Sequence, residues 1–282
     1  MTTTTRFWAV DKIVLAYFAA TAVLIAVYWS VVPSAALRLT WHLLAIALLI
    51  LEVKLPNPSS WIFRNWYPIL YVASCYKEMS ILIGAIRHSN ADQALADLDY
   101  RIWGVHPTVW LERILSPPLT EFLQIAYTLF IPMLILAGVL LWWHGKYEEF
   151  RYYAFLISLG FLASYVGYIL VPARGPRFLL KDLQHMPLQG MWFFRQMQSA
   201  LDQLESTAWD CFPSGHTELT ILAWWSSRMI SNRVFWAYLA YTPFLIFATV
   251  YLRYHYTVDV MAGILLAAIL IAAGPAIYRR MS

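Results

Sequence analysis

Apolar stretches of about 20 residues, the length that a helix needs to cross a bilayer, recur along the whole chain. Hydrophobic residues make up 61% of the 282 positions and charged residues only 13%, whereas soluble domains carry about 25% charged residues. The 14 tryptophans and 18 tyrosines suit the aromatic belts that anchor helices at membrane interfaces. The sequence therefore predicts an all-α, polytopic protein that is integral to the membrane bilayer.

The charge balance and the cysteine content argue against other classes of protein. The 20 basic residues exceed the 16 acidic ones only slightly, and we attribute this excess to cytoplasmic loops rather than to nucleic-acid binding. Cys75 and Cys211 are too few for a disulfide framework, so we expect two inert thiols. No cysteine and histidine cluster has metal-ligand spacing, and no glycine-rich nucleotide loop occurs. The sequence carries no signal for an oligomeric state.

Apolar length, flanking charge and chain breakers predict eight membrane spans. These spans are Lys12–Val32, Leu37–Leu55, Trp66–Ile86, Leu119–Trp143, Tyr152–Val171, Gly215–Ile230, Val234–Tyr251 and Val258–Tyr278. The third span contains Lys77 and Glu78, which either pair with a neighbouring helix or mark a segment that lies flat on the membrane surface. We expect the first span to be retained, because no small-residue cleavage site follows it.

Positive charges in the short loops predict the orientation. The loops His144–Arg151 and Arg228–Arg233 and the C-terminus, which ends in two arginines before its last residues, are basic, so all three are expected in the cytoplasm. Alternation then places the N-terminus in the cytoplasm and the polar segments 87–118 and 172–213 outside it. Both outer segments contain amphipathic stretches, which are expected either to lie in the interface or to cap a lipid-facing site.

Two short polar strings, each with a histidine, lie where apolar spans meet outer segments. The first string is Cys211–Thr217, with His216, and the second is Arg253–Asp259, with His255. Titratable groups at this depth are costly unless they have a function. Because imidazole can act as a nucleophile or an acid near neutral pH, two histidines at one level of the membrane suggest phosphoryl chemistry.

His255 and Asp259 are four residues apart and so share one face of a helix. The carboxylate can accept a hydrogen bond from one ring nitrogen and leave the other free to attack a substrate. The alternative is a structural pair that caps the helix N-terminus. Ser214 and Gly215 precede His216 at the start of a span, where backbone N–H groups bind anions and His216 can act as a general acid. The alternative for this string is a serine N-cap with an incidental histidine.

Arginines near the same predicted face are candidate phosphate ligands. Arg174 and Arg177 follow the fifth span, and Arg253 lies two residues before His255. Guanidinium groups bind phosphate oxygens in a bidentate manner. The alternative is that these side chains only reach towards lipid headgroups. Together, the three strings supply a nucleophile with its orienting group, an acid and anion donors.

These strings resemble the signature motifs of a known family. Pro213-Ser214-Gly215-His216 and the His255-x-x-x-Asp259 unit are similar to the second and third motifs of the type 2 phosphatidic acid phosphatase superfamily, and Gly175-Pro176-Arg177 is similar to a variant of the first. The resemblance runs from about Glu121 to Tyr278. It implies a six-helix core over residues 66–282, preceded by a transmembrane hairpin over residues 1–65.

The resemblance also implies a mechanism. His255 would be the nucleophile that forms a phosphohistidine, Asp259 would orient it, and His216 would be the acid for the leaving group. The phosphoryl oxygens would be bound by Ser214, the backbone of Gly215 and Arg177. The family implies neither a metal nor another cofactor.

Some basic residues of the family are missing. The lysine expected seven residues before the first-motif arginine is Leu170 or Gly167, depending on which arginine is aligned. The arginine expected six residues before the third-motif histidine is Thr249, and Arg253 is the proposed substitute for its charge. These changes, with the Ser-Gly-His-Thr string, are similar to the lipid phosphotransferases of the superfamily, such as sphingomyelin and inositol phosphorylceramide synthases.

We therefore expect a membrane enzyme that cleaves a lipid phosphate at an extracytoplasmic site, with water as the final acceptor. Transfer of a phosphoryl headgroup to a lipid alcohol is the alternative reaction. A transporter or lipid-binding scaffold is the alternative from another class of protein. The intact set of His216, His255 and Asp259 favours an enzyme, because a scaffold has no physical need of it.

Overall fold

The computed structural model describes residues 6–55, 61–205 and 209–282, and in this part of the chain it contains helices and no strands. The α-helices are α1 (Ala9–Val27), α2 (Ala35–Lys54), α3 (Trp61–Ile86), α4 (Asp92–Trp103), α5 (Pro107–Trp110), α6 (Pro117–Thr128), α7 (Phe130–Trp143), α8 (Tyr147–Leu170), α9 (Pro176–Leu179), α10 (Phe194–Glu205), α11 (Gly215–Ser227), α12 (Asn232–Tyr251) and α13 (Thr257–Met281). Two 3₁₀ helices are η2 (Leu111–Ile114) and η3 (Lys181–Leu183). The predicted all-α, polytopic fold is confirmed.

Among the described residues, six helices are long and apolar enough to cross a membrane, namely α1, α2, α3, α8, α12 and α13. The pair α6 and α7, bent by 44° at Leu129, makes a seventh if it counts as one span. The third predicted span is one of the six, and within it Glu78 forms an ion pair with Arg38 of α2. This pairing is the first of the two alternatives that its charges allowed.

The sixth predicted span, Gly215–Ile230, is shorter in the structure. Its helix α11 has 13 residues and so rises only about 20 Å, against about 30 Å of hydrocarbon. Most of its side chains are buried, and it packs against α7, α8, α12 and α13. Because these neighbours surround it, α11 need not span the bilayer itself. The sequence could not reveal this, since apolar length does not separate a buried core helix from a lipid-facing one.

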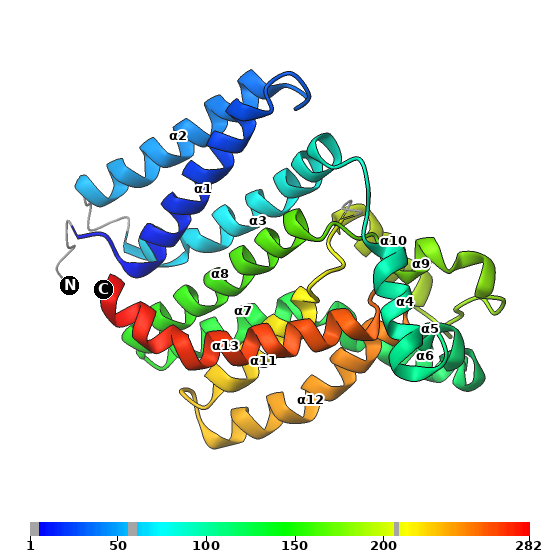
Figure 1. Cartoon of the computed structure of the whole chain (residues 1–282). Helices are drawn as coiled ribbons and strands as arrows, with labels where there is room; N and C mark the ends of the chain where they lie inside the picture. Colours follow the sequence, from blue (N-terminus) through cyan, green and yellow to red (C-terminus); the bar gives the residue numbers. More distant parts are fainter. Residues whose placement is uncertain (1–5, 56–60, 206–208) are drawn as a thin grey trace.

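The two ends of the bundle differ in content. The termini meet at one end, where Arg6 donates to the carbonyl of Ser282 (Figure 1). The basic loops 144–151 and 228–233, which the sequence predicted to share a side, also meet there. The guanidinium of Arg151 lies 4.4 Å from the ring centroid of Trp8. Lys146 donates to the carbonyl of Met229 at 2.7 Å. The short helices α4, α5, α6, α9 and α10 gather at the opposite end. Which end is cytoplasmic stays a prediction.

Helix α4 ties together segments that are far apart in the sequence. The carboxylate of Asp92 accepts hydrogen bonds from the backbone N–H groups of Arg174 and Gly175, at 2.9 and 2.7 Å, and from the hydroxyl of Tyr256, at 3.1 Å. It therefore joins the arginine string to the second histidine string. Gly175 has φ of +100°, and a Cβ there would lie 2.7 Å from the carbonyl oxygen of Tyr254, so this junction requires glycine.

Two further carboxylates organise the same end of the bundle. Asp99 of α4 accepts hydrogen bonds from the backbone N–H groups of Thr257 and Val258, both at 2.9 Å, and so satisfies the first turn of α13. Glu121 of α6 accepts hydrogen bonds from the four consecutive backbone N–H groups of residues 191–194. At this end of the bundle, carboxylates thus fix the polar segments by accepting hydrogen bonds from backbone N–H groups. The same hydrogen bonds hold the histidine strings in place.

Candidate active site

The two histidines lie against each other. The ring centroids of His216 and His255 are 5.8 Å apart and their planes are inclined at 61°. His216 stands in the first turn of α11, whereas His255 lies in the loop between α12 and α13 and is 3% exposed. The two strings, which the sequence placed on one predicted face, therefore meet in space.

A backbone carbonyl sets the orientation of His255. Its Nδ1 lies 2.8 Å from the carbonyl oxygen of Cys211 and 3.5 Å from Oδ2 of Asp259. Since a carbonyl only accepts hydrogen bonds, Nδ1 must carry the proton, and in a neutral ring Nε2 then holds the lone pair. The sequence suggested Asp259 for this role. The closer partner has no side-chain signature, so no sequence pattern could have indicated it.

Asp259 is fully buried, and its two carboxylate oxygens differ in their hydrogen bonds. Its Oδ2 accepts hydrogen bonds from the backbone N–H of Tyr256 at 2.8 Å and from the thiol of Cys211 at 2.9 Å. Its Oδ1 has no hydrogen-bond partner among the described residues. Asp259 thus caps the start of α13, as the structural alternative proposed, and it also stands beside the His255 ring. The two roles are compatible.

Cys211 contacts both members of this pair. Its backbone carbonyl accepts a hydrogen bond from Nδ1–H of His255, and its thiol donates a hydrogen bond to Asp259. Burial, and after it the negative charge of Asp259, raises the pKa of the Cys211 thiol well above its ordinary value. The group therefore stays protonated and acts as a donor. Sequence reasoning treated Cys211 as inert, because a lone cysteine carries no motif.

The string before His216 forms a tight helix start. Ser214 Oγ caps α11 by accepting hydrogen bonds from the backbone N–H and the hydroxyl of Thr217, at 3.3 and 3.0 Å. The backbone N–H of Ser214 donates to the carbonyl of Asp259 at 3.0 Å, which joins the two histidine strings directly. A Cβ on Gly215 would lie 2.5 Å from the hydroxyl of Tyr168, so the close packing here requires glycine. The N-cap alternative for Ser214 is realised, and its own hydroxyl proton is not used in these bonds.

Aromatic rings hold His216 in place. Tyr127 stacks on its ring with a centroid distance of 4.5 Å, and Phe130 lies at 4.4 Å. Tyr254, the residue before His255, stacks in turn on Tyr127 at 4.4 Å. These rings come from α6, α7 and the second histidine string. Their contribution was missed from the sequence, because aromatic residues are frequent throughout the chain.

Of the two arginines in the segment 174–177, Arg177 lies near one of these rings. The guanidinium of Arg177 lies 5.0 Å from the Tyr254 ring centroid and donates to Asp202 at 2.9 Å. Arg174 stacks on Phe178 at 4.4 Å. Both guanidinium groups are therefore held by contacts that a phosphate could supplement or replace. Their phosphate-binding roles stay predictions.

Arg253 is engaged elsewhere. Its guanidinium donates to Glu112 at 2.8 Å and to the carbonyl oxygen of Met186 at 2.6 Å. Its backbone has φ of +68°, a left-handed conformation that turns the chain between Tyr251 and His255. Burial lowers the pKa of Arg253 from its ordinary value, with the charge of Glu112 opposing that shift. Phosphate binding by Arg253 stays a prediction, and it would require this ion pair to be given up.

Two of the three positions where the family carries basic residues, Gly167 and Thr249, are closely packed here. A Cβ on Gly167 would lie 2.3 Å from Cδ of Pro213, so α8 touches the first histidine string where a longer side chain would not fit. Thr249 is fully buried, and its carbonyl oxygen accepts the backbone N–H of His255 at 3.0 Å. Leu170 is 65% exposed. Glycine and threonine therefore suit the local packing at 167 and 249, whereas the exposed position 170 does not restrict its side chain.

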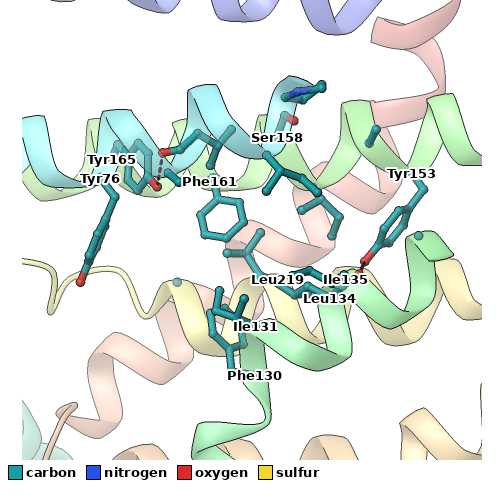
Figure 2. A pocket seen from close by; sticks show the side chains of 18 of the residues that line it. Tyr76, Phe130, Ile131, Leu134, Ile135, Tyr153, Ser158, Phe161, Tyr165 and Leu219 are labelled. Carbon is teal, nitrogen blue, oxygen red and sulfur yellow. Dashed lines mark hydrogen bonds between the residues drawn. The ribbon is translucent and has the colours of Figure 1, made fainter. Parts of the chain in front are cut away.

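An apolar cavity of about 410 Å³ adjoins His216, and Figure 2 shows some of the aliphatic and aromatic side chains that line it. Its walls come mainly from α3, α7, α8 and α11, and His216 and Gly215 belong to its lining. Most other lining side chains are aliphatic or aromatic, such as Ile131, Leu134 and Phe161, with Asp210 among the few charged ones. A cavity of this size and lining suits a hydrocarbon chain.

The fold and the site define a polytopic membrane protein with paired histidines at one end of its bundle. The sequence profile of the PAP2 superfamily matches residues 93–273, so the chain belongs to that superfamily. Its members are phosphoester hydrolases or phosphotransferases. No curated protein and no solved structure gave a significant match to the chain. The resemblance to the sphingomyelin synthase-like branch therefore stays a prediction.

Proposed function

We propose that this protein is a lipid-phosphate phosphatase that works through a phosphohistidine intermediate at an extracytoplasmic site. The observation that carries the proposal is the state of His255. Its Nδ1 proton is bound by the Cys211 carbonyl at 2.8 Å, which leaves the lone pair on Nε2, and its ring lies 5.8 Å from that of His216. A nucleophile and an acid are thus adjacent.

In the first step, Nε2 of His255 attacks phosphorus and the bond from phosphorus to the ester oxygen breaks. Burial lowers the pKa of His216 well below its ordinary value, and the anionic phosphate bound beside it favours the protonated ring. His216 then gives its proton to the departing oxygen, so the lipid leaves as a neutral alcohol. The phosphorylated ring carries a positive charge, which the Asp259 carboxylate stabilises from 3.5 Å. The orientation of the ring does not depend on that charge, because the Cys211 carbonyl holds Nδ1–H.

In the second step, water attacks the phosphohistidine and the nitrogen–phosphorus bond breaks. His216, now neutral, takes a proton from that water, and inorganic phosphate is released. The phosphoryl oxygens are bound in both steps by the N-terminus of α11 at Gly215, by the hydroxyl of Ser214 and by Arg177, since helix N-termini and guanidinium groups favour anions.

The apolar cavity supports a lipid substrate. A phosphate held at the start of α11 lies beside His216, and the cavity continues from there between α3, α7 and α8. A hydrocarbon chain attached to the phosphate would bury its surface in this cavity. Burial of each methylene group contributes about 0.8 kcal/mol, so a soluble phosphoester would bind much more weakly.

The test is release of inorganic phosphate in detergent from a panel of phosphatidate and polyprenyl diphosphate, without added metal. Short-chain and soluble phosphoesters serve as controls for the cavity. We expect turnover of the long-chain substrates and trapping of acid-labile, base-stable phosphate on His255 after a rapid quench. Full activity in a His255→Ala variant would contradict the mechanism.

The apolar lining also favours a second candidate, transfer of the phosphoryl headgroup to a lipid alcohol. An apolar cavity that adjoins His216 admits a hydrophobic acceptor more readily than water. The same assay with ceramide or diacylglycerol added, and products resolved by mass spectrometry, separates the two reactions. Labelled headgroup on the added lipid with little free phosphate would identify the transferase. No turnover of any lipid phosphate would favour a non-enzymatic scaffold.

A further inference from the structure

Three metal-ligating groups meet behind the His255 ring, on the side away from Nε2. They are the thiol of Cys211, Nδ1 of His255 and the carboxylate of Asp259, and all three residues are buried. The sulfur lies 2.9 Å from Oδ2 of Asp259 and 3.7 Å from Nδ1, and Nδ1 lies 3.5 Å from the same oxygen. The three atoms come from two strings that are more than 40 residues apart in the sequence, so their spacing gave no metal signal.

The separations match the size of a zinc ion. A circle through atoms 2.9, 3.5 and 3.7 Å apart has a radius of about 2.0 Å, so one point lies at the usual zinc–ligand distance, about 2.0–2.3 Å, from all three. The second carboxylate oxygen of Asp259, Oδ1, is buried without a hydrogen-bond partner among the described residues. This unsatisfied oxygen is an independent sign that the group can accept a cation.

We propose that Zn²⁺ binds to Cys211, His255 and Asp259 and inhibits the enzyme. The thiol of Cys211 loses its proton to solvent as the sulfur–zinc bond forms, and Nδ1 of His255 binds zinc in place of its hydrogen bond to the Cys211 carbonyl. A neutral imidazole keeps one proton, so that proton moves through solvent from Nδ1 to Nε2. Nε2 then has no lone pair with which to attack phosphorus. One proton is released for each zinc bound.

The chemistry of the ligands favours zinc over the hard cations. A thiolate and an imidazole bind Zn²⁺ or Co²⁺ well, whereas Mg²⁺ prefers oxygen ligands. The metal would bind at Nδ1 of His255, opposite the attacking Nε2, and would not enter the phosphate site. The inhibitory effect rests on the proposed role of His255 as nucleophile, but the binding of the metal does not.

Binding is tested first, with Co²⁺ as a spectroscopic probe on the metal-free, full-length protein in detergent. We expect about one equivalent to bind and to give the intense thiolate-to-cobalt absorption band. Cys211→Ser should lose this band, while Cys75→Ser, which removes the other buried thiol, should keep it. Asp259→Asn, which leaves the thiol in place, should weaken Co²⁺ binding at least about 10-fold, because metal affinity depends strongly on each ligand.

Retention of the band in Cys211→Ser, or its loss in Cys75→Ser, would overturn the proposal. Size-exclusion chromatography checks that each variant is folded. If Cys211→Ser does not fold, the Asp259→Asn titration decides, and affinity equal to that of the wild type would count against the site.

Inhibition is tested second, with each variant's rate expressed relative to its own metal-free rate. Zn²⁺ should inhibit the wild type and Cys75→Ser alike, and the concentration for half-inhibition should rise at least about 10-fold in Cys211→Ser. Mg²⁺ is the control for cations that bind the substrate phosphate. Stoichiometric Co²⁺ binding without any lipid-phosphate turnover would leave the metal site standing and reject the proposed function. Turnover that zinc does not affect would reject this inference and leave the function intact.

Discussion

At the end of the bundle where the termini meet, Asp11 is fully buried and both of its carboxylate oxygens accept hydrogen bonds. Arg64 binds both oxygens, Tyr67 donates to Oδ1, and the backbone N–H of Trp8 donates to Oδ2. At the opposite end Asp259 is equally buried, but its neighbours are a histidine, a thiol and a backbone N–H, and one of its oxygens lacks a hydrogen-bond partner in the part of the chain that the structure describes.

We infer that the difference separates a structural carboxylate from one that takes part in the proposed reaction. The charge of Asp11 is neutralised by a guanidinium in a closed pair, and such a pair is costly to break but does no chemistry. No arginine or lysine hydrogen-bonds to Asp259 among the described residues, so its charge is available to a cation that forms nearby. The phosphorylated ring of His255 would be such a cation. Each prediction below tests this contrast.

The largest effect is expected from His255→Ala. Removal of the nucleophile should lower kcat for phosphate release by about 10⁴-fold or more, because the covalent step cannot occur. The measurement is single-turnover phosphate release with a long-chain substrate, alongside a size-exclusion profile that should match the wild type. Retained turnover would contradict the assignment of His255 as the nucleophile beside Asp259.

His216→Ala should have the next largest effect, a loss of about 10²–10⁴-fold in kcat, the usual contribution of a general acid. A substrate with an activated phenolate leaving group needs little protonation, so it should be cleaved with a much smaller loss in the first step. The ratio of the two losses is the measurement. Equal losses with both substrates would mean that His216 positions the ring of His255 and does not donate a proton.

Asp11→Asn should destabilise the protein without changing its chemistry. It leaves Arg64 buried beside a neutral amide, which should cost about 3 kcal/mol in the free energy of unfolding. Thermal melting in detergent measures the loss, and kcat per folded molecule should equal that of the wild type. A fall in kcat with unchanged melting would reverse the assignment of the two carboxylates.

Asp259→Asn should do the opposite. The amide oxygen can still accept the backbone N–H of Tyr256, so melting should change little, and the Cys211 carbonyl still holds the proton on Nδ1 of His255. Loss of the negative charge should lower kcat by about 10- to 100-fold, less than where an aspartate sets the tautomer. A loss as large as that of His255→Ala would show that Asp259, not Cys211, orients the ring.

The smallest effect separates two arginines. Arg177→Gln should raise KM by about 10-fold, the value of one charge-assisted hydrogen bond to phosphate. Arg253→Gln should raise KM less, because its ion pair with Glu112 is largely buried and its guanidinium also donates to the carbonyl of Met186. The ion pair of Arg177 with Asp202 is more exposed and easier to exchange for phosphate. The matched measurement is KM for one substrate in both variants. A larger rise in Arg253→Gln than in Arg177→Gln would favour Arg253 as the main phosphate ligand among the arginines that the sequence suggested.

Much of the fold could be predicted from apolar length alone. Most predicted spans correspond to long helices, since lipid requires about 20 apolar residues of each crossing. There are two exceptions. Apolar length could not distinguish α11, a helix buried among neighbours, from one facing lipid, and it did not show that the predicted span Leu119–Trp143 is bent by 44° between α6 and α7. The sequence also predicted that the strings of His216 and His255 lie on one face of the membrane, because both strings stand at the ends of spans.

Contacts made by backbone could not be predicted. The Cys211 carbonyl that holds His255, and the two backbone N–H groups that Asp92 binds, involve atoms that every residue possesses. Their partners are chosen by how distant helices pack. The diversion of Arg253 to Glu112 has the same cause, since the partner lies 141 residues away in the sequence.

The sequence by itself determined that the chain is a membrane helical bundle with two histidines and a carboxylate at span ends, because those properties follow from residue type and local period. The tertiary structure decided which groups surround them. It placed a carbonyl and a thiol against the His255–Asp259 pair, gave one carboxylate oxygen no hydrogen-bond partner within residues 6–55, 61–205 and 209–282, and set an apolar cavity beside His216. These depend on distances between segments far apart in the chain, and only the packing of the helices fixes such distances.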